Sequence, residues 1–353
     1  MKKILILAND VTTILQFRCE LISAFVEYGN DVIVSVPKSE RIVEIEALGA
    51  QVVITDVARR GKNPLKDIRT YRQYKKLLKD IKPDVVLTFT IKPNVYGGMA
   101  CGKMKIPYVA NITGLGVVEK QGLLQKLMLF LYRKGLKKAQ CVFFQNQANK
   151  DFFEKKKIVK GKTELLPGSG VNVDKFHYLD FPKGENINIV FVGRIMKEKG
   201  VFELAEAIRG IDRKGVKFTI LGDAEQGAEN PFMGMENVEC VGYKKNVVDY
   251  LSQAHAIVLP SYHEGMANVL LEAASCGRAV LASRIPGCQE AFDESVTGFG
   301  FEKEDVTTLK EAINKFLNLT QEQKCEMGRL GREKMLSQFN RRIVINKYFE
   351  QVK

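Results

Sequence analysis

Two carboxylates in the second half of the sequence have the type and spacing to do chemistry. Glu264 lies in a short polar stretch after an apolar run, and Glu272 follows eight residues later within an apolar segment. An ionised carboxylate among apolar neighbours needs a hydrogen-bonding or charged partner. The spacing alone leaves a second interpretation open, in which one Glu is a loop charge and the other an exposed helix charge.

Arg194 and Lys199 form a second candidate pair. They stand five residues apart, directly after the apolar run 187–192 and before a predicted helix. Arg offers a planar fork of donors and Lys a compact charge, so two such cations on one loop can converge on a diphosphate. The positive end of the following helix would add to the attraction. A solvated basic turn is the alternative.

Three elements must position the two carboxylates. The apolar run 256–259 reads as a buried parallel strand, 267–275 as a helix that ends before Gly277, and 279–282 as a second buried strand. Strand, loop, helix and strand form the repeating unit of an open α/β sheet. Ligands of such sheets bind beyond the carboxyl ends of the strands, where Glu264 is predicted to lie.

The same alternation continues along the chain and predicts doubly wound sheets with right-handed crossovers. Strands are predicted at 3–7, 31–36, 51–54, 85–88, 108–112, 187–192, 218–221 and 238–241. Helices are predicted at 15–28, 42–48, 65–81, 95–103, 247–254, 306–317, 321–336 and 341–352. The loop 9–13 after the first strand contains no Gly. A dinucleotide fingerprint is therefore absent, which argues against an NAD enzyme.

Length and composition are those of a globular protein with two domains. A chain of 353 residues exceeds what one core usually fills. No apolar run approaches the roughly 18 residues of a membrane span, and the short apolar start reads as a strand rather than a signal peptide. The seven cysteines are scattered without metal-ligand spacing, which is typical of reduced, cytosolic proteins.

The positive charge is concentrated in one region. The net charge is +13, of which the region 120–162, with 12 Lys or Arg against two acidic residues, carries +10. Such a region indicates an anionic partner: lipid headgroups, a diphosphate-linked acceptor or nucleic acid. The stretch 123–136 has the pattern of a basic amphipathic helix, which favours membrane contact over a merely solvated face. Nucleic acid is disfavoured, because Trp is absent and aromatic residues are sparse between the lysines.

The motifs around the carboxylates resemble those of a known family. Pro-Ser-Tyr-His-Glu-Gly at 260–265, Leu-Glu-Ala at 271–273, Cys-Gly-Arg at 276–278 and Pro-Gly-Cys-Gln-Glu at 286–290 are similar to the second half of the family-4 retaining glycosyltransferases. The resemblance implies the GT-B fold, with two Rossmann-like doubly wound domains facing across a cleft. Residues 1–168, with a C-terminal helix at 338–353 that crosses back, would bind the acceptor, and residues 169–337 would bind the nucleotide-sugar donor.

The resemblance also implies roles for individual residues. Arg194 and Lys199 would grip the donor phosphates and stabilise the leaving diphosphate. Glu264 would contact the donor sugar and Glu272 the ribose hydroxyls. Further donor contacts would come from Gly222, Tyr243, Gly265, Met266 and Ala267, the last three through backbone amides. The reaction would retain the anomeric configuration and need neither a metal nor another cofactor.

Acceptor contacts are expected in the first half. The candidates are Lys92, Asn94, Thr113 and Gly114, which follow predicted strands in the motifs Thr-Ile-Lys-Pro-Asn and Thr-Gly-Leu-Gly. His assistance is doubtful, because the three His residues lie outside this region. The motif style resembles bacterial enzymes that build capsule, exopolysaccharide or O-antigen units from UDP-sugars on a polyprenyl diphosphate. That implies a cytoplasmic protein, peripheral at the inner face of the membrane.

Two other classes of function stay open. One is a different GT-B enzyme, such as a UDP-N-acetylglucosamine 2-epimerase or an inverting transferase. The other is a non-enzymatic protein that binds membranes or nucleic acid through the basic region. The combination of two cations with two carboxylates favours the retaining transferase.

Overall fold

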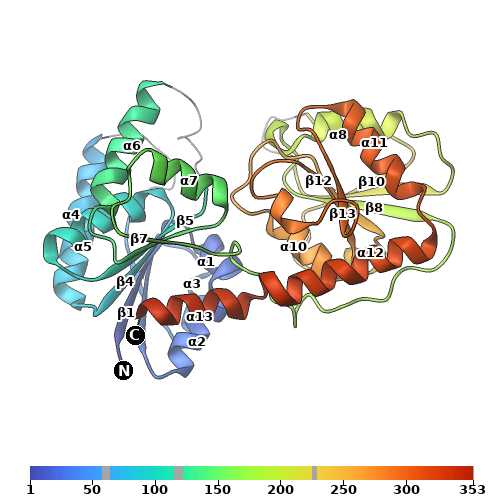
Figure 1. The fold of residues 1–353 in the computed structure, drawn as a ribbon. Coiled ribbons are helices and arrows are strands. Elements are labelled where there is room, and N and C mark those ends of the chain that lie inside the picture. Colours follow the sequence, from blue (N-terminus) through green and yellow to red (C-terminus); the bar gives the residue numbers. More distant parts are fainter. Residues whose placement is uncertain (58–63, 115–121, 225–228, 353) are drawn as a thin grey trace. The chain divides into compact units, whose positions relative to one another are not determined.

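The computed structural model describes residues 1–57, 64–114, 122–224 and 229–352. The chain divides into two compact units (Figure 1). The first unit comprises Met1–Ser169 together with Val344–Lys353, and the second comprises Gly170–Ile343. Among the helices of the described residues, none combines the length and apolar character needed to span a bilayer.

The first unit contains a sheet of seven parallel strands in the order β3-β2-β1-β4-β5-β6-β7. The strands are β1 (Lys3–Leu7), β2 (Asp31–Val36), β3 (Gln51–Ile54), β4 (Val85–Phe89), β5 (Tyr108–Ile112), β6 (Cys141–Phe144) and β7 (Lys162–Leu165). The central strands are buried along their whole length, because helices cover both faces of the sheet. The strand order reverses between β1 and β4.

Each face of this sheet has its own hydrophobic core. One face packs against α1 (Val11–Phe17), α2 (Cys19–Glu27), α3 (Ile42–Glu46) and α13 (Arg341–Val352). The other packs against α4 (Pro64–Ile81), the π-helical turn η1 (Pro93–Gly97), α5 (Gly98–Met104), α6 (Leu123–Leu136) and α7 (Gln147–Lys155). From α13, the side chains of Val344, Tyr348 and Val352 are buried in the first core. The prediction of a last helix that crosses back to the first unit is confirmed.

The beginning of the chain differs from the prediction in one respect. The single helix predicted at 15–28 is two helices, α1 and α2, separated at Arg18. The carboxylate of Asp10 accepts a hydrogen bond from the amide of Thr12, at 3.3 Å, and so caps α1. The predicted loop 9–13 is therefore mostly the first turn of a helix.

The second unit contains six parallel strands in the order β10-β9-β8-β11-β12-β13. They are β8 (Ile187–Val192), β9 (Val216–Leu221), β10 (Val238–Gly242), β11 (Ala256–Leu259), β12 (Ala279–Ser283) and β13 (Gly298–Phe301). The helices are α8 (Val201–Arg209), α9 (Val248–Ser252), α10 (Asn268–Ser275), α11 (Val306–Leu317) and α12 (Gln321–Lys334), with the short turns η3 (Lys197–Lys199), η4 (Gln289–Ala291) and η5 (Met335–Phe339). The prediction of two doubly wound parallel sheets is confirmed.

The chain passes from one unit to the other at two places, and the two segments contact each other within the second unit. Val171 pairs with Asn340 in a parallel bridge, and the buried Arg341 side chain donates to the carbonyl of Gly170 at 3.0 Å. Gly170 has φ +67°, and a Cβ there would lie 2.5 Å from the Cα of Arg341. Only Gly allows this approach.

Candidate active site

The candidate residues of the second unit follow strands that end at one edge of its sheet. Arg194 and Lys199 follow β8, Gly222 follows β9, Tyr243 follows β10 and Glu264 follows β11. All these strands are parallel, so their carboxyl ends share that edge. The strand order reverses between β8 and β11. Ligands of doubly wound sheets bind at such a reversal, which lies between the turns that carry the two cations and Glu264.

A cation and a carboxylate meet across this reversal. The Nζ of Lys199 lies 2.5 Å from Oε1 of Glu264, and both side chains are largely buried, with exposed fractions of 23% and 15%. Ser261 donates its hydroxyl to the same carboxylate oxygen at 2.9 Å. The contact joins residues 65 apart in the sequence. The structure thus brings Lys199 and Glu264 together as a preformed pair.

Glycines allow the turns to approach this closely. Gly200, which ends the turn η3, has φ +68°, and a Cβ there would lie 2.0 Å from the carbonyl oxygen of Pro260. Gly222 has φ +141°, and its Cβ would lie 1.9 Å from the carbonyl oxygen of Gly193. A side chain at Gly200 would push the turn η3 away from the turn after β11, which carries Glu264, and one at Gly222 would push the turn after β9 away from the turn that carries Arg194. Gly222 is therefore a backbone requirement of the site.

Arg194 lies on the same turn as Lys199. Its side chain is exposed, and it directly follows Gly193. The Cδ of Lys199 lies 3.9 Å from where a Cβ of Gly193 would be, so the lysine stem passes beside this turn. The two cations predicted to grip a diphosphate therefore belong to one compact stretch of chain.

Asp223 joins the turns of the candidate site, and the sequence did not single it out. Its Oδ1 accepts the amide hydrogen of Tyr243 at 3.0 Å, and its carbonyl accepts the amide hydrogen of Ile195 at 2.9 Å. Asp223 thereby connects the turns after β8, β9 and β10. Tyr243 itself is 66% exposed at this edge. In the sequence, the Gly-Asp pair that directly follows the predicted strand 218–221 could have indicated this residue.

The stretch from Gly265 to Ala267 differs from expectation. The amide of Ala267, predicted to face the donor, instead donates to the carbonyl of Gly287 at 2.7 Å. Met266 and Ala267 are buried and belong to the hydrophobic core of the unit. Of the three residues, Gly265 is the one that the structure leaves half-buried at the surface.

Glu272 lies on α10, and the charged groups near it differ from those that contact Glu264. Burial raises the pKa of its carboxyl to about 7, although the positive charges of Lys175 and Arg341 pull in the opposite direction. Within the described residues, no hydrogen bond or ion pair joins it to Glu264 or Lys199. In the part of the chain that the structure describes, this half-buried carboxylate receives no hydrogen bond, so it is suited to accept hydrogen bonds from a ligand.

The candidates of the first unit are less available. Lys92 forms an ion pair with Asp67 at 3.1 Å, and both side chains are largely buried. Asn94 is buried; it accepts a hydrogen bond from the Thr88 hydroxyl and donates one to the carbonyl of Asn111. Its side chain therefore stabilises the sheet instead of facing an acceptor.

Thr113 and Gly114 follow β5 and are half-buried. The rest of their motif, Leu115 and Gly116, lies outside the described residues, as does Lys120 at the start of the basic region.

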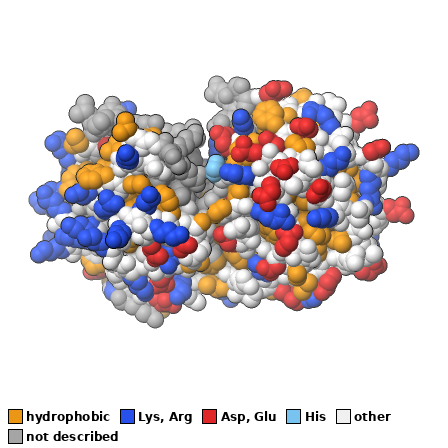
Figure 2. All heavy atoms as spheres, turned by 45° about the horizontal axis from the view of Figure 1, so that its top comes forward, with side chains coloured by type: hydrophobic (Ala, Val, Ile, Leu, Met, Phe, Trp, Pro, Cys, Tyr) orange, Lys and Arg blue, Asp and Glu red, His pale blue; other side chains and the backbone are white. Residues whose placement is uncertain are grey.

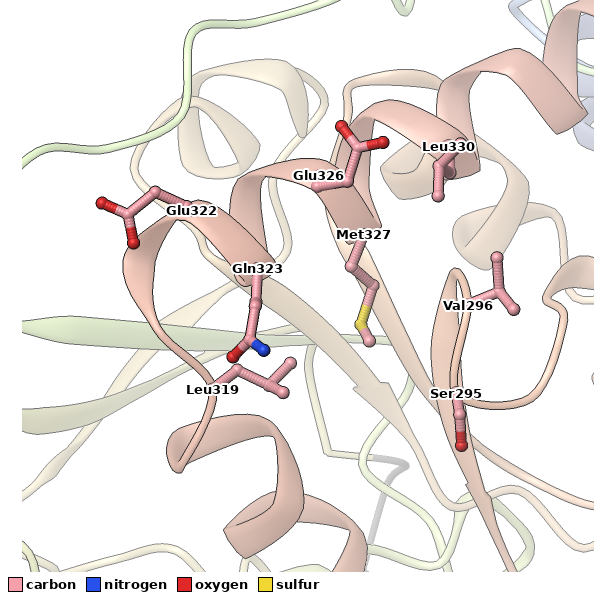
Figure 3. Close-up of a pocket in the computed structure, with 8 residues that line it drawn as sticks. All are labelled: Ser295, Val296, Leu319, Glu322, Gln323, Glu326, Met327 and Leu330. Carbon is pink, nitrogen blue, oxygen red and sulfur yellow. The ribbon is translucent and has the colours of Figure 1, made fainter.

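An open hollow of about 490 Å³ lies elsewhere on the second unit, beside α12 (Figure 3). Its lining is Ser295, Val296, Leu319, Glu322, Gln323, Glu326, Met327 and Leu330. Two carboxylates and an apolar floor do not suit a diphosphate, and none of the candidate residues lines it. The sheet edge remains the candidate active site.

Both halves of the chain match the profiles of known protein families. Residues 186–319 match the profile of the glycosyl transferases group 1, and residues 3–146 match that of the glycosyl transferase 4-like domains. The two matches together include every strand of the first unit except β7, and every strand of the second.

Two of the similar proteins are bacterial transferases. The chain is 28% identical over 332 residues to the N,N'-diacetylbacillosaminyl-diphospho-undecaprenol α-1,3-N-acetylgalactosaminyltransferase of Campylobacter jejuni, with 88% of each chain covered. It is 23% identical over 305 residues to the UDP-Gal:α-D-GlcNAc-diphosphoundecaprenol α-1,3-galactosyltransferase of Escherichia coli, with 78% of this chain and 76% of that one covered.

The fold is similar to that of Anabaena HepE, solved in complex with UDP. The TM-score is 0.80 at 17% identity, and 99% of this chain and 98% of that one are covered. Together with the two doubly wound sheets and the site at the sheet edge, these matches show that the chain belongs to the group 1, family-4-like glycosyltransferases of the GT-B fold.

Proposed function

We propose that the protein is a retaining, metal-independent transferase that moves a hexose or N-acetylhexosamine from a UDP-sugar to a saccharide linked to a polyprenyl diphosphate. The observation that carries the proposal is the Lys199–Glu264 pair at the strand-order reversal of the second unit. One group of the pair suits a phosphate and the other suits sugar hydroxyls.

The pair can serve both parts of a nucleotide-sugar at once. A lysine ammonium has three N–H donors, so Lys199 can keep its bond to Glu264 while it also donates to a phosphate oxygen. Arg194, on the same turn, adds a second positive charge. Negative charge develops on the diphosphate as the sugar leaves, and two fixed cations stabilise it, which is the part that a metal ion plays in other transferases.

The relatives support the substrate class and the stereochemistry. The two bacterial relatives are named as α-1,3-transferases that act on undecaprenol-linked diphospho-sugars, and one of them is named for UDP-Gal. UDP-hexoses carry the sugar in the α configuration, so an α product retains it. HepE, which shares the fold, binds UDP.

A donor screen tests this proposal. We expect UDP and one UDP-sugar to raise the melting temperature, whereas GDP- and ADP-sugars leave it unchanged. Transfer to a polyprenyl diphosphate-linked saccharide should yield an α linkage by NMR and should continue in EDTA. A β linkage, or activity that disappears in EDTA and returns with Mg²⁺, would contradict the mechanism. Epimerisation of UDP-N-acetylglucosamine without an acceptor would favour the 2-epimerase instead.

The basic region of the first unit supports a membrane-bound acceptor. Leu123, Leu127 and Phe130 stand at helical spacing on α6 and are 87%, 52% and 50% exposed. Figure 2 shows Lys and Arg side chains gathered over the part of this unit that contains α4, α5 and α6, whereas both signs alternate over the second unit. Exposed apolar side chains among basic ones are the pattern of a helix that lies on an anionic membrane.

The anchoring of α6 gives this surface a fixed form. A Cβ on Gly135 would lie 2.6 Å from the Cα of Val95, so α6 packs backbone against backbone on η1. Arg133 donates to the carbonyl of Lys156 at 3.1 Å and so links α6 to the exposed stretch Lys155–Lys157. The basic helix and the basic stretch therefore form one surface.

Neutralising that stretch should weaken membrane binding. Changing Lys155, Lys156 and Lys157 to Gln removes charges worth about 1 kcal/mol each near an anionic bilayer. We therefore expect the affinity for phosphatidylglycerol vesicles, measured by co-sedimentation, to fall ~10- to 100-fold. UDP affinity should stay the same. The matched control changes the exposed Lys214, Lys217 and Lys315 of the second unit to Gln. Equal losses in both triple variants would show a nonspecific charge effect and contradict the surface.

A further inference from the structure

The turn after β12 packs against the loop that carries Glu264. The carbonyl of Gly287 accepts the amide hydrogen of Ala267 at 2.7 Å. Gly287 has φ +89°, and a Cβ there would lie 2.7 Å from the carbonyl oxygen of Glu264 and 2.8 Å from that of Gly265. The two turns thus touch backbone to backbone, and no side chain fits between them.

Gly287 is in turn held by the carboxylate of Glu290. The Oε2 of Glu290 accepts the amide hydrogen of Gly287 at 2.7 Å. This carboxylate is half-buried, and burial raises its pKa although the backbone amides pull in the opposite direction. A hydrogen bond to an ionised acceptor is stronger than a neutral one and fixes the position of the donor more firmly. Two consecutive bonds therefore lead from Glu290 through Gly287 to the Glu264 loop.

Cys288, which directly follows Gly287, is influenced by Glu290 and by both members of the Lys199–Glu264 pair. Cys288 is fully buried. Burial raises the pKa of its thiol, and the charges of Glu264, Lys199 and Glu290 all act on it. The three charged side chains therefore all lie within electrostatic range of the same buried thiol.

We propose that Glu290 is a positioning residue for the reaction: through Gly287 it fixes the Glu264–Ala267 loop, and with it the carboxylate that pairs with Lys199. The inference rests on the proposed function for its kinetic consequence only, because the positioning itself is a property of the protein without substrate. Glu290 acts on the sugar side of the donor, so its loss affects turnover and leaves the grip on UDP intact.

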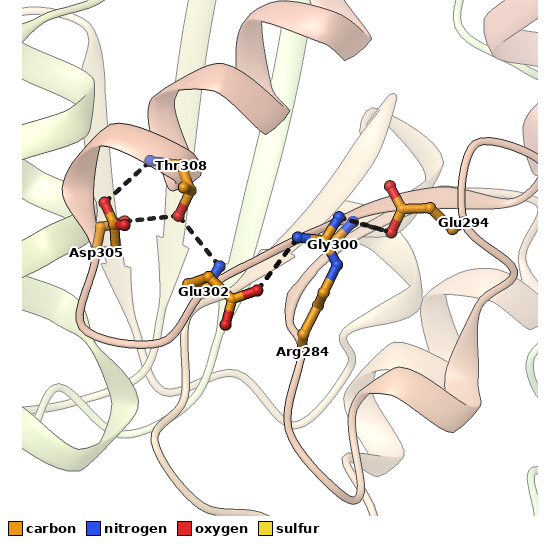
Figure 4. Close-up of polar contacts among 6 residues, drawn as sticks. All are labelled: Arg284, Glu294, Gly300, Glu302, Asp305 and Thr308. Carbon is orange, nitrogen blue, oxygen red and sulfur yellow. Dashed lines mark hydrogen bonds and ion pairs between the residues drawn. The ribbon is translucent and has the colours of Figure 1, made fainter.

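The chain offers a matched control in Glu294. Four residues after Glu290, its Oε2 accepts the amide hydrogen of another glycine, Gly300, at 3.1 Å and pairs with Arg284 at 3.1 Å (Figure 4). It therefore makes the same kind of bond, but to β13 instead of the turn that touches Glu264. Glu294→Ala removes a carboxylate and a backbone contact of equal type outside the proposed path.

The first measurement is hydrogen exchange in the free protein. Glu290→Ala is expected to speed amide exchange in peptides that cover 264–270 at least ~10-fold, because Gly287, whose carbonyl accepts the Ala267 amide, is no longer fixed by a charged hydrogen bond. Glu290→Gln, which keeps an acceptor for Gly287, should restore most of the protection. Glu294→Ala should leave these peptides unchanged. If Glu290→Ala does not fold, Glu290→Asp, which withdraws the carboxylate by one methylene, replaces it.

The second measurement is the kinetics of the same variants. For Glu290→Ala we expect kcat to fall ~10- to 100-fold with UDP affinity within twofold of the wild type, and Glu290→Gln to recover most of the loss. Unchanged exchange in 264–270, or a Gln variant as impaired as the Ala variant, would overturn the positioning role. Loss of UDP affinity in parallel with kcat would show a merely structural role. Absence of transfer in every protein, wild type included, would contradict the proposed function and leave the exchange result standing.

Discussion

Glu272→Gln is expected to stabilise the second unit by about 3 kcal/mol at pH 8 and to lower transfer by ~10²-fold or more. Burial raises the pKa of Glu272 from 4.5 to about 7, so the folded protein holds a charge at pH 8 that its surroundings disfavour. Gln has the same shape and no charge to desolvate. It also loses the anionic acceptor that, by resemblance to the family, would bind the ribose hydroxyls.

The pH dependence of this effect has a definite sign. Because the folded pKa is raised, the unfavourable contribution of Glu272 is absent below about pH 4.5, grows as the pH rises towards 7 and is complete above that. The stability difference between the variant and the wild type should therefore be near zero at pH 4.5 and largest at pH 8.

The stability contribution of a second buried group, His255, changes with pH in the opposite direction. Burial, with the charges of Arg278 and Lys324, lowers the pKa of His255 to about 4. Its contribution to stability is present above about pH 6.5 and is lost as the pH falls towards 4. Since Glu272 opposes it in nearly the same range, the contributions of these two groups largely cancel in the wild type. The Gln variant should show a clear rise in stability between pH 4.5 and 7.

Native-state hydrogen exchange of the buried strand β11 reports the free energy of unfolding of the second unit and can be followed from pH 5 to 8. Glu311→Gln, at an exposed position of α11, is the matched control and should change neither stability nor turnover. A Glu272→Gln protein that is less stable than the wild type at pH 8, or that transfers sugar normally, would contradict the assignment.

Lys199→Ala is expected to reduce kcat by ~10²- to 10³-fold, because it removes a fixed cation from the developing diphosphate charge. It also leaves the Glu264 carboxylate, 15% exposed, without the ammonium that contacts it at 2.5 Å. Lys197 provides the control: it lies in the same short turn, is exposed and has the same charge. Lys197→Ala should stay within about threefold of the wild type.

The double variant distinguishes a functional pair from two independent residues. If Lys199 and Glu264 act as a unit, Lys199→Ala with Glu264→Ala should be hardly slower than the worse single variant. Losses that multiply would show that the contact seen here has no part in turnover. Arg194→Ala, on the same turn, should also lower transfer by ~10²-fold. Steady-state kinetics at saturating acceptor give the kcat of the two single variants, the double variant and Arg194→Ala.

Much of the fold could be predicted from the sequence because its signals are local. Runs such as Ala256–Leu259 are apolar on both faces, which only a covered parallel strand requires, and glycines mark the helix ends. β13 could not be found in this way. Its sequence, Gly-Phe-Gly-Phe, has glycines at alternate positions, and Gly298 is needed because a Cβ would lie 2.0 Å from the carbonyl oxygen of Val280. That requirement comes from a neighbouring strand.

The candidate site was predictable in its residue types but not in its contacts. Spacing on one turn indicates Arg194 and Lys199, yet the bond from Lys199 to Glu264 spans 65 residues and depends on the strand order. The hydrogen bond from the amide of Ala267 to the carbonyl of Gly287 likewise joins two different turns and could not be predicted from local sequence. Asn94 has the polarity of a ligand contact, but its partners Thr88 and Asn111 lie on adjacent strands of the sheet.

The return of α13 to the first sheet has a consequence for synthesis on the ribosome. Tyr348 accepts a hydrogen bond from Asn111, 237 residues before it, and Lys2 binds the carbonyl of Val352. Translation from β7 to the end of α13 takes roughly 10 to 40 seconds at about 5–20 residues per second. During that interval the second unit, which is continuous in sequence, can fold, while an apolar strip on the first sheet waits uncovered. The half of the protein that is made first is thus completed last, and a stalled nascent chain would present that strip to chaperones.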